Sequence, residues 1–327
     1  MIESLPIVGV DIDSRSCVCF FEGKRRRRKF DNNPSGFKEL REWLKSQADG
    51  PFLVCMESTG RYSEPVAEYL DQHGHMVVVA NPGFVSQHKE SLNQHNKTDP
   101  TDAEAIGSYA RCFRDKLRLW KPLDEVHKRL RDVLGQMYLL KKTITAFSNR
   151  GQCGLFDDDV ISSNDQILSH LRSELATLAQ LREELFEQLP KLDEVRKIVD
   201  EVPGIGPEIA DSLAVHVRFE DFRNGRDLAM FLGCGSSQWA SGKQKRRGKQ
   251  KKTGDPQMRS LLRQGAVSAM RSSFYRPFVE RLRKKGLSNG KIVGAIARKM
   301  VLIAYALWRR KEPFDRFYEH PLAKKRT

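Results

Sequence analysis

The sequence predicts an α/β domain followed by an all-α region, and three observations lead to this prediction. Between residues 7 and 80, short apolar runs of strand length alternate with segments of helical periodicity, which is typical of an α/β domain. From residue 124 onwards, apolar residues recur in steps of three and four, which indicates long helices. The formal net charge is +15 over 327 residues, and a surplus of this size indicates a polyanionic partner.

The first domain is expected to hold a mixed sheet. Residues 7–11 and 17–21 predict two strands, and residues 24–30 predict a third that completes an antiparallel group. The buried-type runs 52–57 and 76–80 predict two more strands, each preceded and followed by an amphipathic helix. The predicted order is therefore three strands, helix, strand, helix, strand, helix.

Acidic residues stand where these strands end and where a later helix begins. Asp11 ends the first strand, Glu57 ends the fourth, and Asp99 and Asp102 open a helix. Because chemistry in open α/β sheets lies at the carboxyl ends of strands, we expect the four acids to converge. They would repel one another unless hard divalent cations, which prefer oxygen ligands, neutralised them. The alternative for the last two acids is a helix cap with a second acid favoured by the dipole. Asp13 lies past the strand end and is expected to have a minor role at most.

Residues 124–192 predict two long helices that carry heptad seams. One seam runs from Val126 to Phe147 and the other from Leu168 to Leu192, with a break at 151–159. Such helices form an antiparallel hairpin, pair between chains or belong to one globular bundle. We favour a coiled-coil arm that helps to dimerise the protein, because a seam this regular needs an apolar partner. Pro190 is expected to kink or end the second helix.

The last third of the chain and the predicted third strand hold candidate nucleic-acid contacts. Gly204 and Gly206 lie between two apolar helices, where either a helix–hairpin–helix turn that binds a phosphate or a simple tight turn is expected. Seven of the ten residues 243–252 are Lys or Arg, which predicts a flexible loop that is disordered until it meets nucleic acid. For the cations of the third strand, a solvated hairpin edge is the alternative. The candidate cations are Lys24, Arg25, Arg26, Arg27, Arg28, Lys29, Lys243, Lys245, Arg246, Arg247, Lys249, Lys251 and Lys252.

Ser241 directly precedes the second group of cations. A serine at this place can attack a phosphodiester while the cations hold the scissile phosphate. From the spacing alone, an ordinary loop serine is the plainer interpretation.

Composition excludes several other classes of protein. No signal peptide is predicted, because Glu3 and Asp11 interrupt the apolar N-terminal run, and the longest apolar run, Met300 to Trp308, is too short to cross a membrane. The six cysteines form no CxxC pair and no zinc spacing, so we expect mostly buried thiols in a reducing cytoplasm. Nucleic acid is favoured over an anionic membrane, since no segment has the pattern of an amphipathic anchor.

Three motifs resemble the DEDD transposases of bacterial insertion sequences, a family that includes the Piv-type DNA invertases and the bridge-RNA-guided recombinases. The motifs are Gly-Val-Asp at Asp11, Met-Glu-Ser-Thr-Gly at Glu57 and Asn-Lys-Thr-Asp-Pro-Thr-Asp-Ala at 96–103. The later Pro-Gly-Ile-Gly and the Ser-Gly pair at Ser241 resemble the C-terminal domain of the same family. The resemblance spans nearly the whole chain, and its third motif is the most specific.

The resemblance implies an N-terminal RuvC-like, RNase H-type catalytic domain over residues 1–122. It implies a coiled-coil dimerisation region over 123–197 and a helical C-terminal transposase domain over 198–327, which holds the helix–hairpin–helix and a nucleophilic serine. It also implies a dimer or a tetramer in which different subunits share active sites. A structured guide RNA would pair with target and donor DNA, so that base pairing selects the sites.

For the chemistry, the resemblance implies that Asp11, Glu57, Asp99 and Asp102 bind Mg²⁺ and that Ser241 forms a covalent phosphoserine link to DNA. A nuclease of the Holliday-junction type that uses metal alone is the alternative, and a catalytically idle nucleic-acid scaffold is the third.

The sequence departs from the family pattern just before the serine. Trp239 and Ala240 stand where the family has an aromatic residue and an acid. Ser236 and Ser237 therefore stay as alternative nucleophiles to Ser241.

Overall fold

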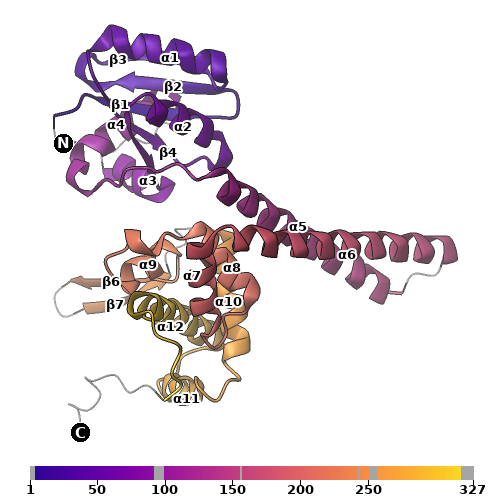
Figure 1. Cartoon of the computed structure of the whole chain (residues 1–327). Coiled ribbons are helices and arrows are strands. Elements are labelled where there is room, and N and C mark those ends of the chain that lie inside the picture. The colour runs from indigo at the N-terminus through magenta and orange to yellow at the C-terminus, as the bar shows by residue number, and fades with distance from the viewer. Residues whose placement is uncertain (1–3, 92–98, 155–156, 242–243, 251–255, 318–327) are drawn as a thin grey trace. The chain divides into compact units, whose positions relative to one another are not determined.

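A computed structural model describes residues 4–91, 99–154, 157–241, 244–250 and 256–317 (Figure 1). At 99–101 and throughout 236–250, it describes the backbone but not the side chains. The chain divides into two compact units, Met1–Pro122 and Leu123–Thr327. The first is α/β and the second is mainly helical, as the sequence predicts, while the division into three functional domains stays a prediction.

The first unit is built on a five-stranded mixed sheet. Its strands are β1 (Ile7–Ile12), β2 (Ser16–Phe21), β3 (Arg26–Asp31), β4 (Leu53–Glu57) and β5 (Met76–Ala80), and they lie in the order β3-β2-β1-β4-β5. The first three strands are antiparallel, whereas β4 and β5 run parallel to β1. This arrangement confirms the predicted mixed sheet and its antiparallel group.

Helices cover both faces of this sheet. On one face, α1 (Pro34–Gln47) and α2 (Glu64–Gln72) form an apolar core with β1, β2 and β4. On the other face, α3 (Pro82–Ser91) and α4 (Asp99–Cys112) form a second core with β1, β4 and β5. The described residues of this unit also form the short 3₁₀ turns η1 (Glu22–Lys24), η2 (Gly60–Tyr62) and η3 (Arg114–Lys116).

The second unit begins with a two-helix arm (Figure 1). The start of α5 (Glu125–Gln152) packs against the end of α6 (Asp158–Glu187), since Leu130 and Val133 share a core with Leu185. The two predicted seams therefore meet within one chain as an antiparallel hairpin. The prediction for Pro190 is confirmed, because α6 ends just before it and the next helix begins there.

The remaining helices surround α12 (Asn289–Arg310). Apolar residues from each of them pack in one core with Ile296, Met300 and Val301 of α12, which are buried. No helix in the described part of the chain is long and apolar enough to cross a membrane. These elements are α7 (Pro190–Asp200), α8 (Pro207–His216), η4 (Phe219–Asp221), α9 (Gly225–Phe231), α10 (Pro256–Ala269), α11 (Arg276–Lys284) and α12 (Asn289–Arg310).

The basic segment that we expected to be a flexible loop is largely a strand, so that prediction was wrong. β6 (Ser236–Ser241) pairs antiparallel with β7 (Gln244–Gln250). Pairing satisfies the backbone N–H and C=O groups that each strand turns toward the other, and these bonds do not depend on apolar side chains. Composition alone does not reveal such a partner. The predicted contacts that lie outside the described residues are Lys243, Lys251 and Lys252.

The cysteine prediction is confirmed for four of the six residues. Cys17, Cys19, Cys55 and Cys234 are buried free thiols, and burial raises the pKa of the Cys55 thiol to about 12. The other two, Cys112 and Cys153, are exposed.

Candidate active site

Asp11 and Glu57 occupy matching positions on adjacent parallel strands. The register of β1 and β4 pairs Val10 with Met56, and the two acids are the next residues on their strands. Both acids are partly buried. Because neighbouring strands lie about 4.8 Å apart, the backbones of these acids are close neighbours at the carboxyl edge of the sheet.

Both acids belong to the face of the sheet that α4 covers. Side chains alternate along a strand, so residues two apart share a face. Val10 and Met56 lie in the core with α1 and α2, whereas Cys55 lies in the core with α4. Asp11 and Glu57 follow Val10 and Met56, and therefore lie on the α4 side.

The helix α4 lies flat on β1 and runs in the opposite direction. A Cβ atom on Gly9 would stand 2.1 Å from the Ala103 carbonyl oxygen, so the helix and strand backbones are in direct contact there. Just after α4, Arg114 donates a hydrogen bond of 2.9 Å to the Leu5 carbonyl, close to the start of β1. The amino end of α4 therefore lies beside the end of β1 that carries Asp11.

Asp102 stands one residue before Ala103 in this first part of α4 and already has a cationic partner. Lys89, in the last turn of α3, places its Nζ 2.9 Å from Asp102 Oδ1, and the two side chains are 20% and 21% exposed. The backbone of Asp99 opens α4, while its side chain lies outside the described residues. Lys89 was missed by the sequence analysis, because its proximity to Asp102 depends on how α3 and α4 dock.

The described donors fit a hard divalent cation in their chemistry. Asp11, Glu57 and Asp102 supply carboxylate oxygens from three elements on one face of the sheet, and the Lys89 ammonium shows that a cation is accommodated beside Asp102. Within the side chains that the structure describes, no three Asp, Glu, His or Cys groups are gathered closely enough to form a metal cluster. Asp11, Glu57 and Asp102 are among those side chains and do not form such a cluster by themselves, whereas the Asp99 carboxylate lies outside them.

Two family models match the chain. Residues 8–155 match a DEDD transposase model of the IS110 group, described as "Transposase", and residues 196–279 match the model described as "Transposase IS116/IS110/IS902 family". The chain belongs to this family of transposases. It is therefore an enzyme of DNA recombination or transposition, and the family implies a divalent metal.

Curated relatives are similar over nearly the same length. The transposase is 28% identical to the pilin gene-inverting protein of Moraxella bovis over 320 residues. The matched region covers 94% of this chain and 97% of the Moraxella protein. The pilin gene-inverting protein of Moraxella lacunata has the same identity and coverage. The "Probable family 20 transposase" of Pseudomonas aeruginosa is 26% identical over 299 residues, covering 80% of this chain and 85% of that protein.

Asp13 has a structural place in the transposase. Its Oδ1 accepts hydrogen bonds from the backbone N–H groups of Arg15 and Ser16, at 2.6 and 2.8 Å, and its Oδ2 accepts one from the Ser16 hydroxyl at 2.7 Å. These bonds lower the pKa of the Asp13 carboxyl, with the Arg15 bond contributing most. The side chain therefore closes the turn between β1 and β2.

The candidate serine ends a strand of the second unit. The backbone of Ser241 is the last of β6 and pairs with Gln244 at the start of β7. Ser236 and Ser237 begin the same strand. All three side chains lie outside the described residues, so the choice of Ser241 stays a prediction.

The two candidate glycines of the second unit differ in their surroundings. Gly204 has a φ of +93°, and a Cβ there would stand 2.6 Å from the Ala269 Cβ, so this position requires glycine for both conformation and packing. Gly206 is the N-cap of α8, and a Cβ there would meet no atom within 4 Å. Of the two, Gly206 is the one with open space around it, and phosphate binding at this turn stays a prediction.

Proposed function

We propose that this transposase is an RNA-guided DNA recombinase of an insertion sequence, which cleaves and rejoins DNA through a phosphoserine intermediate. Asp11, Glu57, Asp99 and Asp102 would hold Mg²⁺, and Ser241 would be the nucleophile. The observation that best supports the proposal is the placement of Asp11, Glu57 and Asp102 at one corner of the sheet, from three segments distant in sequence. A purely structural role gives no reason for acids from three segments to share one corner.

In the proposed reaction, the Ser241 hydroxyl oxygen attacks the scissile phosphorus. A new serine O–P bond forms, one P–O bond to a deoxyribose oxygen breaks, and the serine proton leaves to a base. The released deoxyribose oxygen takes up a proton. Rejoining reverses this sequence with the hydroxyl of another strand end, and Ser241 is regenerated.

The carboxylates would orient the reacting phosphate against Ser241. Bound Mg²⁺ would supply electrostatic stabilisation of the phosphate and of the leaving oxygen. Lys89, paired with Asp102 at 2.9 Å, balances one of the negative charges at this corner. The β6–β7 hairpin would bring cations close to the serine, since Lys245, Arg246, Arg247 and Lys249 belong to β7.

The transposase would act as an oligomer in complex with a guide RNA. The net charge of +15 and the family resemblance support a complex with a structured RNA as well as target and donor DNA. The α5–α6 arm supports dimerisation, because it leaves apolar side chains exposed: Leu139 at 54% and Ile167 at 39%. A tetramer, as a dimer of dimers, would let active sites combine units from different subunits.

The experiment that tests the proposal looks for a covalent protein–DNA adduct. Purified full-length protein, the flanking RNA, Mg²⁺ and a DNA substrate that traps cleaved ends are combined, resolved on a denaturing gel and analysed by mass spectrometry. We expect an adduct on Ser241 that is lost in Ser241→Ala and Asp102→Asn. Ser236→Ala and Ser237→Ala are the matched controls, and each should keep the adduct.

Three outcomes would contradict parts of the proposal. An adduct that survives Ser241→Ala but is lost in Ser236→Ala or Ser237→Ala moves the nucleophile. Metal-dependent cleavage without any adduct supports a nuclease that uses metal alone. An adduct that forms equally well without RNA refutes RNA guidance while leaving the serine chemistry in place.

A further inference from the structure

The six consecutive cations at 24–29 do not share one surface. Strand β3 pairs with β2 so that Arg27 stands opposite Phe20 and Lys29 opposite Val18, whereas Arg28 stands opposite Cys19. Alternation along the strand sends successive side chains to opposite faces of the sheet. The basic run is therefore divided between the α1 side and the α4 side.

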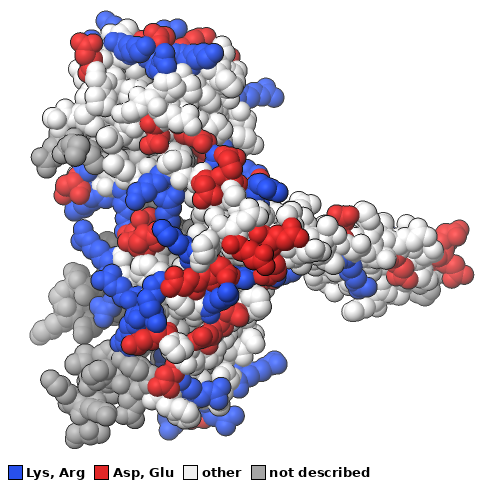
Figure 2. Space-filling model, viewed as in Figure 1, with Lys and Arg blue, Asp and Glu red and all other residues white. Residues whose placement is uncertain are grey.

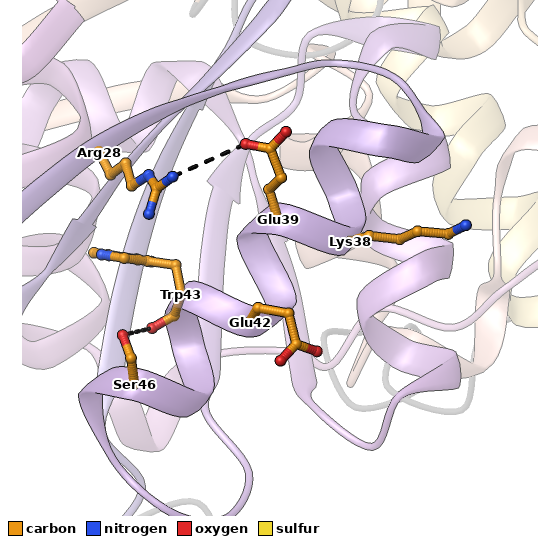
Figure 3. Close-up of a pocket in the computed structure, with 6 residues that line it drawn as sticks. All are labelled: Arg28, Lys38, Glu39, Glu42, Trp43 and Ser46. Atoms are coloured by element: carbon orange, nitrogen blue, oxygen red, sulfur yellow. Dashed lines mark hydrogen bonds and ion pairs between the residues drawn. The ribbon is translucent and has the colours of Figure 1, made fainter.

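Cations on the α1 side are occupied by α1. The Lys24 ammonium donates a hydrogen bond of 2.6 Å to the Gln47 carbonyl at the end of that helix. The Arg28 Nη2 lies 3.9 Å from Glu39 Oε2, and its guanidinium carbon is 5.2 Å from the centre of the Phe30 ring. The pairing of Arg28 with Glu39 is drawn in Figure 3. The hollow on this side is lined by two acids as well as cations, namely Arg28, Lys38, Glu39, Glu42, Trp43 and Ser46. Such a mixed lining is poorly suited to a phosphate chain.

Cations on the other side face α4, the helix that carries Asp102. The Arg27 guanidinium lies over the Phe20 ring at 5.5 Å, and Phe20 packs with Val18 and Ala103. Arg25 pairs with Glu104 of α4 at 2.7 Å, and Arg27 pairs with the other oxygen of the same carboxylate. Two arginines share one acid there, so a positive charge is left over.

Lys29 lies level with the carboxylates on that same side. Lys29 stands opposite Val18, Val18 stands opposite Asp11, and the parallel register continues the row to Glu57. The Lys29 side chain is exposed. With strands about 4.8 Å apart, Lys29 is two strands, or about 10 Å, from Asp11. Phosphates follow one another at about 3.4 Å per nucleotide along a duplex axis, so this distance corresponds to about three nucleotides.

We infer that Lys29, with Arg27 beside it, contacts the DNA backbone on the active-site face and leads the cut strand to the carboxylates. The other side of the run, with Lys24 and Arg28, belongs to the packing of α1. Figure 2 shows Lys and Arg side chains gathered along the part of the first unit where β3 and α1 lie, and the register divides that surface into a binding part and a structural part. The inference rests on the proposed function only in taking the carboxylate corner as the place of cleavage.

Photo-crosslinking tests the side of the sheet that DNA occupies. A photoreactive amino acid is placed at position 29 or, in a separate protein, at position 28, and each full-length protein is irradiated with element-end DNA and flanking RNA that carry different labels. We expect DNA crosslinks from position 29 that exceed those from position 28 by about 10-fold, because the two side chains face opposite ways. Equal DNA crosslinks from both positions, or crosslinks from position 29 to RNA alone, would overturn the inference.

Salt dependence provides the second measurement, on Lys29→Gln and the matched control Lys38→Gln. Lys38 is an exposed lysine on the α1 side. Loss of one phosphate contact lowers the slope of log Kd against log salt by about 1, and we expect this change for Lys29→Gln only. Equal slopes in the two variants would overturn the inference. Neither measurement depends on cleavage, so a missing Ser241 adduct would refute the proposed function separately.

Discussion

The contact between α4 and β1 gives the sharpest prediction, which concerns Gly9→Ala. The added Cβ would stand 2.1 Å from the Ala103 carbonyl oxygen and 2.4 Å from the Gly107 amide nitrogen. Both atoms belong to the backbone, so no side-chain rotation can relieve the clash. To restore ordinary contact, α4 has to move away from β1 by about 1 Å.

This movement has two calculable effects. Overpacking of this kind lowers the free energy of unfolding by about 1–3 kcal/mol. Since Asp102 is the residue before Ala103, the same shift separates Asp102 from Asp11 and Glu57, and a misplacement of about 1 Å can lower a cleavage rate by about 100-fold. We therefore expect Gly9→Ala to lose both stability and cleavage.

Urea unfolding and the cleavage rate measure these effects, with Gly135→Ala as the matched control. Gly135 lies in the exposed middle of α5, and a Cβ there meets no atom within 4 Å. The control should gain about 0.5–1 kcal/mol, because glycine is the poorer helix former, and should keep its cleavage rate. A Gly9→Ala protein with normal stability would refute the close packing of α4 on β1. Lost stability with normal cleavage would refute the positioning of Asp102 through this contact.

Two further predictions concern carboxylates that are not among the proposed metal ligands. Asp13→Ala should lower the free energy of unfolding by about 1 kcal/mol at neutral pH, with cleavage retained, because it removes the hydrogen bonds that close the β1–β2 turn; lost cleavage in a folded variant would place Asp13 in the chemistry. Asp211 of α8 is buried, and burial raises its pKa to about 6 in spite of Arg182, whose Nη1 lies 3.1 Å from Asp211 Oδ2. The folded pKa lies above the ordinary value of 3.8, so its favourable contribution is complete below about pH 4 and is lost as pH rises through about 6, by about 2–3 kcal/mol. In urea titrations across this range, Asp211→Asn should show a smaller fall in stability than the unmodified protein, and an identical fall would contradict the assignment.

The central strands β1, β2 and β4 of the first unit were predictable because they are buried on both sides. In β4, the residues Leu53, Val54, Cys55 and Met56 are each 0% exposed. A strand that is buried on both faces must be an unbroken apolar run. Asp11 and Glu57 could be singled out from the sequence because each acid directly follows an apolar run, while their role at a metal stays a prediction.

Other features depend on pairing that a single sequence does not display. Nothing near Lys89 or Glu104 in the sequence indicates that Lys89 meets Asp102 or that Glu104 meets Arg25 and Arg27, because each contact depends on how separate elements pack. The division of the cations at 24–29 between the two faces of the sheet also depends on the register of β3 against β2. Arg25 has a φ of +49°, and β3 begins only at Arg26, so the face of each cation could not be assigned from six consecutive cations alone.

Substitutions at the acids and at Gly9 affect this corner of the sheet in different ways. Carboxylates that share a corner repel one another unless cations neutralise them, and Lys89 already neutralises Asp102. The stability of that region comes from the apolar neighbours of each acid: Val10, Met56 and Ala103 are each 0% exposed. Replacing Asp102 with asparagine removes the charge that pairs with Lys89 but leaves the apolar packing beside it in place. Loss of the adduct in Asp102→Asn would therefore report on chemistry, whereas Gly9→Ala acts on the packing that positions the same acid.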